Sequence, residues 1–133
     1  MIVKTTTELL AAASAGEPLI ILKRGVRFEL DSPPLVLPGG CTLICRGATL
    51  VATDTGSIPI SDPTSSVIHG FDATVIDPTI RCDGFTGSGL FHRGELICTN
   101  PNVVGYRRKA IQCVDNGSKV DKVIVTGLRC SSE

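Results

Sequence analysis

The sequence predicts an all-β protein, a short parallel β-solenoid that is closed at its N-terminal end by one α-helix. Two observations carry this prediction. Short apolar runs recur along the 133 residues, separated by turns that share 14 glycines and 8 prolines, which is typical of many short strands. The chain has no Trp and only four Phe, so its core must be built from aliphatic residues and Cys, which suit the thin layers of a solenoid.

A helix is predicted near the N-terminus, from Thr6 to Ala15. The segment Thr5-Thr6-Thr7-Glu8 matches a capping box, with Thr5 as the N-cap and Glu8 at the third helical position. Gly16 is a natural stop, because glycine readily adopts the left-handed conformation that ends many helices. The apolar side of this helix, which needs a surface to cover, carries Leu9, Leu10 and Ala13.

Short strands are predicted in the next part of the chain. They are Leu19–Leu22, Val26–Leu30, Leu35–Leu37, Thr42–Cys45 and Ala48–Ala52. The spacers between them are too short for α-helical crossovers. These strands therefore fit either a β-solenoid or an antiparallel sandwich.

A repeated cysteine pattern favours the solenoid. Five of the six Cys follow an aliphatic residue by two positions: Leu43-Ile44-Cys45, Ile80-Arg81-Cys82, Leu96-Ile97-Cys98, Ile111-Gln112-Cys113 and Leu128-Arg129-Cys130. Positions i and i+2 of a strand share a face, so each triplet is expected to turn its aliphatic side chain and thiol inward. From Cys82 onward the triplets recur at nearly regular intervals, which indicates stacked coils. This spacing is short for a three-sided coil, so some triplets are expected on different faces.

Residues from Thr6 to Leu50 combine a helix that ends in Ala-Ser-Ala-Gly, the segment Ser32 to Leu43, and a Gly turn followed by Ala-Thr-Leu at 48–50. This combination resembles the right-handed parallel β-helix of phage tailspike and pectate-lyase-like proteins. The resemblance implies a helix that plugs one end of the coils, and a homo-oligomer, often a parallel homotrimer. We expect one domain over residues 1–133, with an N-terminal strand and the capping helix in 1–16 and coils in 17–133.

The thiols are interpreted as reduced core residues, although a disulfide between coils and a metal site stay open as alternatives. Cys41 and Cys45 are four residues apart on an extended segment, so their Cα atoms lie roughly 13 Å apart, beyond the ~7 Å that a disulfide tolerates. His69 and His92 fall in no zinc-binding arrangement with the Cys residues. No metal and no cofactor are predicted.

Charge and hydropathy restrict the possible partners. Lys and Arg number 13 and so do Asp and Glu, so net charge does not draw the molecule to nucleic acid or to an anionic membrane. The sequence shows neither a signal peptide nor an apolar run of ~18 residues. We expect a protein made in the cytoplasm, which is virion-associated if tailspike-like and otherwise stays in the host cytoplasm.

The acidic residues do not predict an enzyme. Polysaccharide lyases and hydrolases of the resembled fold class act through carboxylates, whereas here no two acids are adjacent and no Asp-x-Asp occurs. The galacturonase segments are also missing, and Ile68-His69-Gly70 matches only one of them in part. No catalytic residue is therefore predicted.

Two segments are candidate binding sites. Tyr106, Arg107, Arg108 and Lys109 form the only concentrated charge, and an aromatic beside three cations suits a phosphate, a nucleic acid or an acidic protein surface. His92 and Arg93 suggest a second anion site. A solvated polar turn is the structural alternative in both cases. The polar stretch Thr53 to Ser66 is expected to project from a coil as a loop.

Three functions follow as hypotheses. The favoured one is a non-enzymatic phage-type binding module, tailspike-like or tail-fibre-like, for a host-surface polysaccharide or a virion protein. The first alternative is a small phage-encoded intracellular inhibitor of a host defence system, which binds a protein or, less expectedly, a nucleotide or nucleic acid. The second is a polysaccharide lyase or hydrolase. Only three residues follow Cys130, so the last coil is expected to expose an edge, which hints at a partner, a trimer or a longer parent chain.

Overall fold

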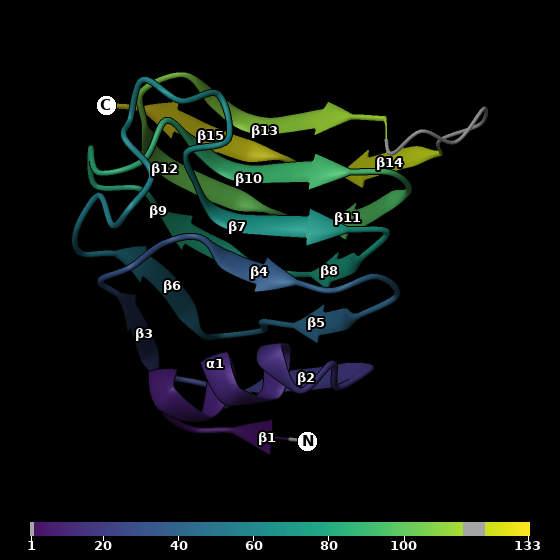
Figure 1. The fold of residues 1–133 in the computed structure, drawn as a ribbon. Helices are drawn as coiled ribbons and strands as arrows, with labels where there is room; N and C mark the ends of the chain where they lie inside the picture. The colour runs from purple at the N-terminus through teal and green to yellow at the C-terminus, as the bar shows by residue number, and fades with distance from the viewer. Residues whose placement is uncertain (1, 116–121) are drawn as a thin grey trace.

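The computed structural model describes residues 2–115 and 122–133, so residues 116–121 of the predicted coil region lie outside the described residues. The chain winds through about five turns of a parallel β-solenoid, with a single short helix at the N-terminus (Figure 1). The predicted fold class is confirmed.

Three parallel sheets form the sides of the solenoid. Sheet A contains β1 (Ile2–Val3), β2 (Leu19–Leu22), β5 (Thr42–Ile44), β8 (Thr74–Ile76), β11 (Leu96–Thr99) and β14 (Val123–Thr126). Sheet B contains β3 (Arg27–Leu30), β6 (Thr49–Ala52), β9 (Thr79–Arg81), β12 (Asn102–Tyr106) and β15 (Arg129–Ser132). Sheet C contains β4 (Leu35–Leu37), β7 (Ser66–Phe71), β10 (Ser88–Arg93) and β13 (Lys109–Val114). Successive strands alternate between the sheets, so β2, β3 and β4 complete the first coil.

The strand register gives the length of a coil. Leu19 pairs with Thr42 and Thr74 pairs with Ile97, so the coil has the same length in both places. Successive cysteine triplets are separated by fewer residues than one coil contains. Each triplet therefore lies on a different sheet from the triplet before it. The triplets from Cys82 onward lie in turn on β9, β11, β13 and β15, or directly beside these strands. The prediction that some triplets occupy different faces is confirmed.

The predicted inward placement of the triplets is confirmed in the coils that have another coil stacked on each side. Leu43, Cys45, Ile80, Cys82, Leu96 and Cys98 are buried, and all six thiols are free. Cys113 and Cys130 also occupy inward positions, because the register pairs them with the buried residues His92 and Val103, but both thiols are exposed. They lie on the last described strands of sheets C and B, where no described coil covers them. The expected exposed edge is found at this end.

Helix α1 (Thr6–Ser14) has the predicted caps. The Thr5 hydroxyl accepts a hydrogen bond from the Glu8 amide at 3.1 Å, and the Glu8 carboxylate accepts one from the amide of Lys4 at 3.3 Å. At the other end the amide of Gly16 donates to Ala13 O and the amide of Glu17 donates to Ala12 O. This pair of bonds is a Schellman motif, and Gly16 supplies its left-handed residue with φ of 74°.

The helix lies across the first coil (Figure 1), but its buried side differs from the predicted one. Leu9, Ala12 and Ala13 are buried, whereas Leu10 is 44% exposed. Residues three and four apart share a helix face, so Ala12 and Ala13 lie below Leu9 while Leu10 points aside. The core below the helix is filled by aliphatic residues from all three sheets.

The loop predicted in the polar stretch is present between β6 and β7, and it is fastened to a later coil. It spans residues 53–65, because Ser66 already belongs to β7. Figure 1 shows it rising beside the later coils before the chain enters β7. The Ser65 hydroxyl accepts a hydrogen bond from the amide of Gly87 at 3.0 Å, which fastens the loop to the next coil.

Candidate functional site

The four residues Tyr106, Arg107, Arg108 and Lys109, here called the corner cluster, lie where β12 leads into β13, at the corner between sheets B and C. Tyr106 packs against the core, and its carbonyl oxygen accepts a hydrogen bond from the amide of Glu133 at 3.1 Å. A hydrogen bond with the Cys130 side chain raises the pKa of the Tyr106 hydroxyl. The ring of Tyr106 is therefore packed in part against the core, and its hydroxyl is engaged by Cys130 of β15.

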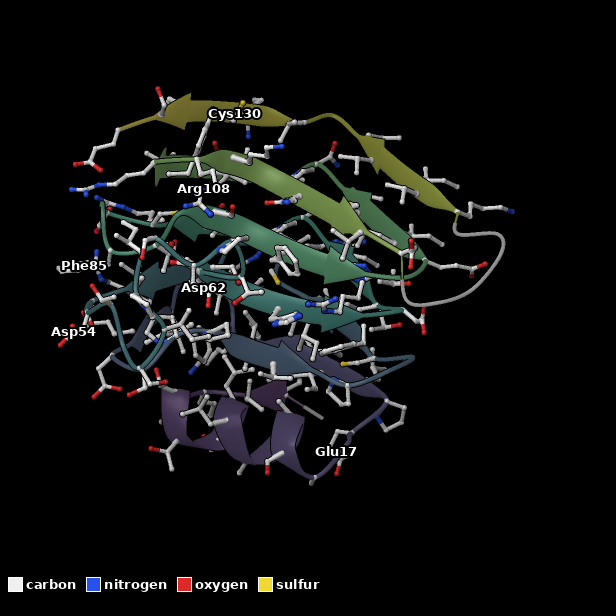
Figure 2. The ribbon with its side chains drawn as sticks, turned by 45° about the horizontal axis from the view of Figure 1, so that its top comes forward. Glu17, Asp54, Asp62, Phe85, Arg108 and Cys130 are labelled. Carbon is white, nitrogen blue, oxygen red and sulfur yellow. The ribbon has the colours of Figure 1, made fainter. Side chains whose placement is uncertain are left out.

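Both arginines of the corner cluster are engaged within the chain. Arg107 Nε lies 2.6 Å from Glu133 Oε2, which raises the pKa of Arg107 and lowers that of Glu133. Arg108 donates to the carbonyl oxygens of Ile60 and Ser61 at 3.4 and 3.2 Å. Figure 2 shows Arg108 and Asp62 on the same side of the molecule. Only Lys109 remains as an exposed cation without such a bond among the described contacts.

His92 and Arg93 do not form one anion site, because they lie on opposite faces of β10. His92 is fully buried, and its Nε2 accepts a hydrogen bond from the amide of Ala73 at 3.0 Å. Burial lowers the pKa of His92, which favours the neutral ring. His92 is therefore a core residue that a ligand cannot reach in this fold, which corrects its place among the binding candidates. Arg93 points outward.

Arg93 belongs to a surface that the sequence did not reveal. We call it the aromatic face, and it is formed by the outward residues of β7, β10 and β13: His69, Phe71, Phe91, Arg93, Gln112 and Val114. The strand register stacks them in two rows. His69, Phe91 and Gln112 form one row, which continues below to Val36 of β4, and Phe71, Arg93 and Val114 form the other.

The rings of the aromatic face contact one another. His69 stacks on Phe71, with centroids 4.8 Å apart and planes at 16°, and meets Phe91 edge to face at 5.1 Å. The guanidinium carbon of Arg93 lies 5.2 Å from the Phe91 centroid, within the range of a cation–π contact. Phe91 is only 3% exposed, although it lies outside the core cluster, because its neighbours in the two rows surround it.

The polar groups of this face are also distinctive. Burial, followed by the charge of Arg93, lowers the pKa of His69, which favours a neutral imidazole. His69 Nε2 and Gln112 Oε1 are buried atoms without a hydrogen-bond partner among the described residues. The face therefore combines the half-buried rings of His69 and Phe71, the buried ring of Phe91, one cation and two buried polar atoms without a partner. This composition is that of sites which bind small polar molecules by packing and a few directed hydrogen bonds.

The sequence contained a weak indication of this face. His69-Gly70-Phe71 and Phe91-His92-Arg93 each alternate a large outward side chain with an inward residue. Their meeting depends on the pairing of Phe91 with His69, which lies one coil earlier in the chain. That pairing could not be read before the coil length was known.

The acidic residues are used mainly in surface contacts. Arg81 pairs with Asp83 at 3.2 Å, and Arg46 with Asp77 at 3.0 Å. Asp77, with φ of 53°, follows the end of the sheet A strand β8 and precedes Pro78, so the chain bends there. Within residues 2–115 and 122–133 no three His, Cys, Asp or Glu side chains are placed to hold a metal ion. In the same ranges, the helix is too short to span a membrane.

The fold and the aromatic face together define a helix-capped β-solenoid with an outward cluster of aromatic residues on one sheet. No protein-family profile matches the chain, and neither the curated proteins nor the solved structures give a significant match. The function must therefore be inferred from the site itself.

Proposed function

We propose that this protein is a non-enzymatic binding module of the phage tailspike type, which recognises a host-surface polysaccharide through the aromatic face. The observation that carries the proposal is the packed cluster of His69, Phe71 and Phe91 with Arg93 above it on an outward sheet surface. Sugar rings have apolar faces that pack on aromatic side chains, and hydroxyl groups that bond to imidazole, amide and guanidinium groups.

A repetitive ligand suits this surface. The strands of a parallel sheet lie about 4.8 Å apart, so the two rows continue across three coils and offer contacts to successive sugar units. Charge supports a neutral or weakly acidic glycan, because Arg93 is the only charged residue of the aromatic face. The homotrimer implied by the resemblance stays part of this proposal.

The proposal is tested by retention of the protein on immobilised bacterial capsular and O-antigen polysaccharides. We expect Phe71→Ala or Arg93→Gln to weaken retention on a bound polysaccharide about tenfold, as for a central contact residue. The matched controls are Phe85→Ala, which removes a ring that is 38% exposed outside this face (Figure 2), and Arg129→Gln on sheet B. Both controls should bind like the wild type, and all four variants should keep the wild-type melting temperature.

Three results would overturn the proposal. The first is no retention on any polysaccharide of the panel, and the second is equal losses in the face variants and the controls. The third is release of new reducing or unsaturated sugar ends during incubation, because that outcome identifies an enzyme. The inhibitor hypothesis stays a prediction from the sequence. The arginines on which it depended are engaged within the chain, so their contacts add no support for it.

A further inference from the structure

A second candidate site lies away from the aromatic face, at the corner where sheet A leads into sheet B. A hollow of about 380 Å³ opens there, and residues of β1, β2 and β5 contribute to its lining. Small-molecule sites typically have volumes of roughly 300–1,000 Å³. The hollow is lined by Ile2, Ile21, Leu22, Lys23, Arg24, Ile44 and Arg46.

The floor of this hollow is formed by Ile2, Ile21 and Ile44, which belong to a longer aliphatic row. Ile2 pairs with Ile21, Ile21 with Ile44, and Ile44 with Ile76, so four isoleucines stack on neighbouring strands. They point outward, since the residues beside them in the strands, such as Ile20 and Leu43, are buried in the core. At the usual strand spacing the row is about 14 Å long. Ile2 is 60% exposed, so apolar surface remains in contact with solvent.

The rim of the hollow is cationic. Among the described residues neither Lys23 nor Arg24 has a carboxylate within ion-pair distance, in contrast to the paired arginines elsewhere on the surface. The third cation, Arg46, uses its Nε for Asp77. The Asp77 carboxylate also accepts a hydrogen bond from Asn100. This bond, and next the bond from Arg46, lower the pKa of Asp77.

The local backbone fixes the position of Arg24. Its aliphatic stem lies over Gly47, where a Cβ atom would come within 2.6 Å of the Arg24 Cγ. The amide of Gly25 donates to the carbonyl of Gly47 at 2.7 Å, which ties the two turns together. The stem of Arg24 is thus held at the rim by packing, while its guanidinium has no acidic partner in the described chain.

We propose that this hollow binds a single-chain fatty carboxylate. The carboxylate is held by Lys23 and Arg24, with Arg46 beside them, because guanidinium groups bind carboxylates through two parallel hydrogen bonds. The acyl chain lies on the isoleucine row and covers its exposed apolar surface. A nucleic acid or a free inorganic anion would leave this aliphatic floor unused, and the narrow row accommodates one chain rather than a bilayer.

The proposal is tested by calorimetric titration with dodecanoate below the concentration at which it forms micelles. We expect saturable binding that the double variant Lys23→Gln, Arg24→Gln weakens at least about tenfold, as charge-assisted hydrogen bonds are lost. The matched control is Arg27→Gln, Arg81→Gln, which removes two exposed cations from sheet B. It should bind like the wild type. Ile21→Thr keeps a β-branched side chain but removes part of the apolar floor, and it should also weaken binding.

Comparison ligands separate the two halves of the site. Dodecanol, with the chain but no charge, and acetate, with the charge but no chain, should each bind at least about tenfold more weakly than dodecanoate. Equal binding of dodecanol, or an equal loss in the control variant, would overturn the proposal. Binding to vesicles with anionic headgroups but not to monomeric dodecanoate would also overturn it. None of these variants alters the aromatic face, so polysaccharide retention should not change.

Discussion

At the scale of single residues, the fit between a buried histidine and a glycine shows how closely the coils are packed. Gly70 and His92 are register partners on β7 and β10. A methyl group at Gly70 would lie 2.8 Å from Cδ2 and 3.2 Å from Nε2 of the His92 ring. The ring cannot move away without cost, because its Nε2 is bonded to the amide of Ala73. Gly70 is therefore required by the space that His92 occupies.

We expect Gly70→Ala to lower the free energy of unfolding by about 1–3 kcal/mol, the usual cost of overpacking a core. Urea unfolding followed by circular dichroism measures it. Gly87→Ala is the matched control, because its new methyl group would meet nothing nearer than 3.5 Å. That control should stay within about 1 kcal/mol of the wild type.

The role of the histidine ring can be tested separately in a double-mutant cycle. In the His92→Ala background, where the ring is gone, Gly70→Ala should cost much less than in the wild type. If the cost is the same in both backgrounds, His92 is not the group that excludes a side chain at position 70.

At the scale of elements, helix α1 is specified by its own sequence. The cap at Thr5 and the Schellman motif at Gly16 involve only residues near the helix ends. Such local bonds satisfy backbone groups that the helix itself leaves unpaired, so the predicted ends differ from the observed ones by a single residue. The buried side of the helix was predicted less well. The coil beneath the helix decides that Leu9 is buried and Leu10 is exposed, and this coil is not part of the helix sequence.

Replacing the cap should weaken the closure of the solenoid. We expect Thr5→Ala to lower the free energy of unfolding by about 1 kcal/mol, since the Glu8 amide loses its acceptor. Thr7→Ala serves as the control, because Thr7 is exposed within the helix and alanine is the better helix former. Chemical unfolding of both variants decides the matter. Equal destabilisation by the two changes would contradict a specific capping role for Thr5.

At the scale of the whole molecule, the two ends of the coil stack are closed differently. Figure 2 shows Cys130 on the last coil, at the opposite end from Glu17, which follows the helix. The helix covers the first coil, whereas Cys113 and Cys130 are exposed at the other end. In between, burial raises the pKa of Cys82 to about 11 and that of Cys98 to about 12, and it also raises that of Cys45.

This arrangement predicts two classes of thiol. Because Cys113 and Cys130 are exposed, a thiol-specific colorimetric reagent at pH 8 should modify both rapidly. Cys113 should react the more slowly of the two, since partial burial raises its pKa and the thiolate is the reactive form. The four buried thiols should react only at the rate of unfolding. The double variant Cys113→Ser, Cys130→Ser should lack the rapid phase altogether. A rapid phase of more than two thiols in the wild type would show that the coils are more open than described.

The candidate sites illustrate where prediction from the sequence ended. The corner cluster was visible as a run of charges, but its arginines are engaged by Glu133 and by the loop carbonyls of Ile60 and Ser61. Those partners are distant in the sequence and come close only when the coils stack. The alternation in two short segments was only a weak indication of the aromatic face, and the isoleucine row was not visible, because each surface gathers residues from separate coils.

The sequence by itself determined the class of fold, the capped helix, the short strands and the inward side of most cysteine triplets. These features depend on local bonds and on the alternation of side chains along a strand, which act over short stretches of chain. Only the tertiary structure decided which strands are neighbours, since the lengths of the turns and of the loop at 53–65 set the register. Register places Phe91 on His69 and Ile44 on Ile21. Both proposed binding surfaces follow from that stacking.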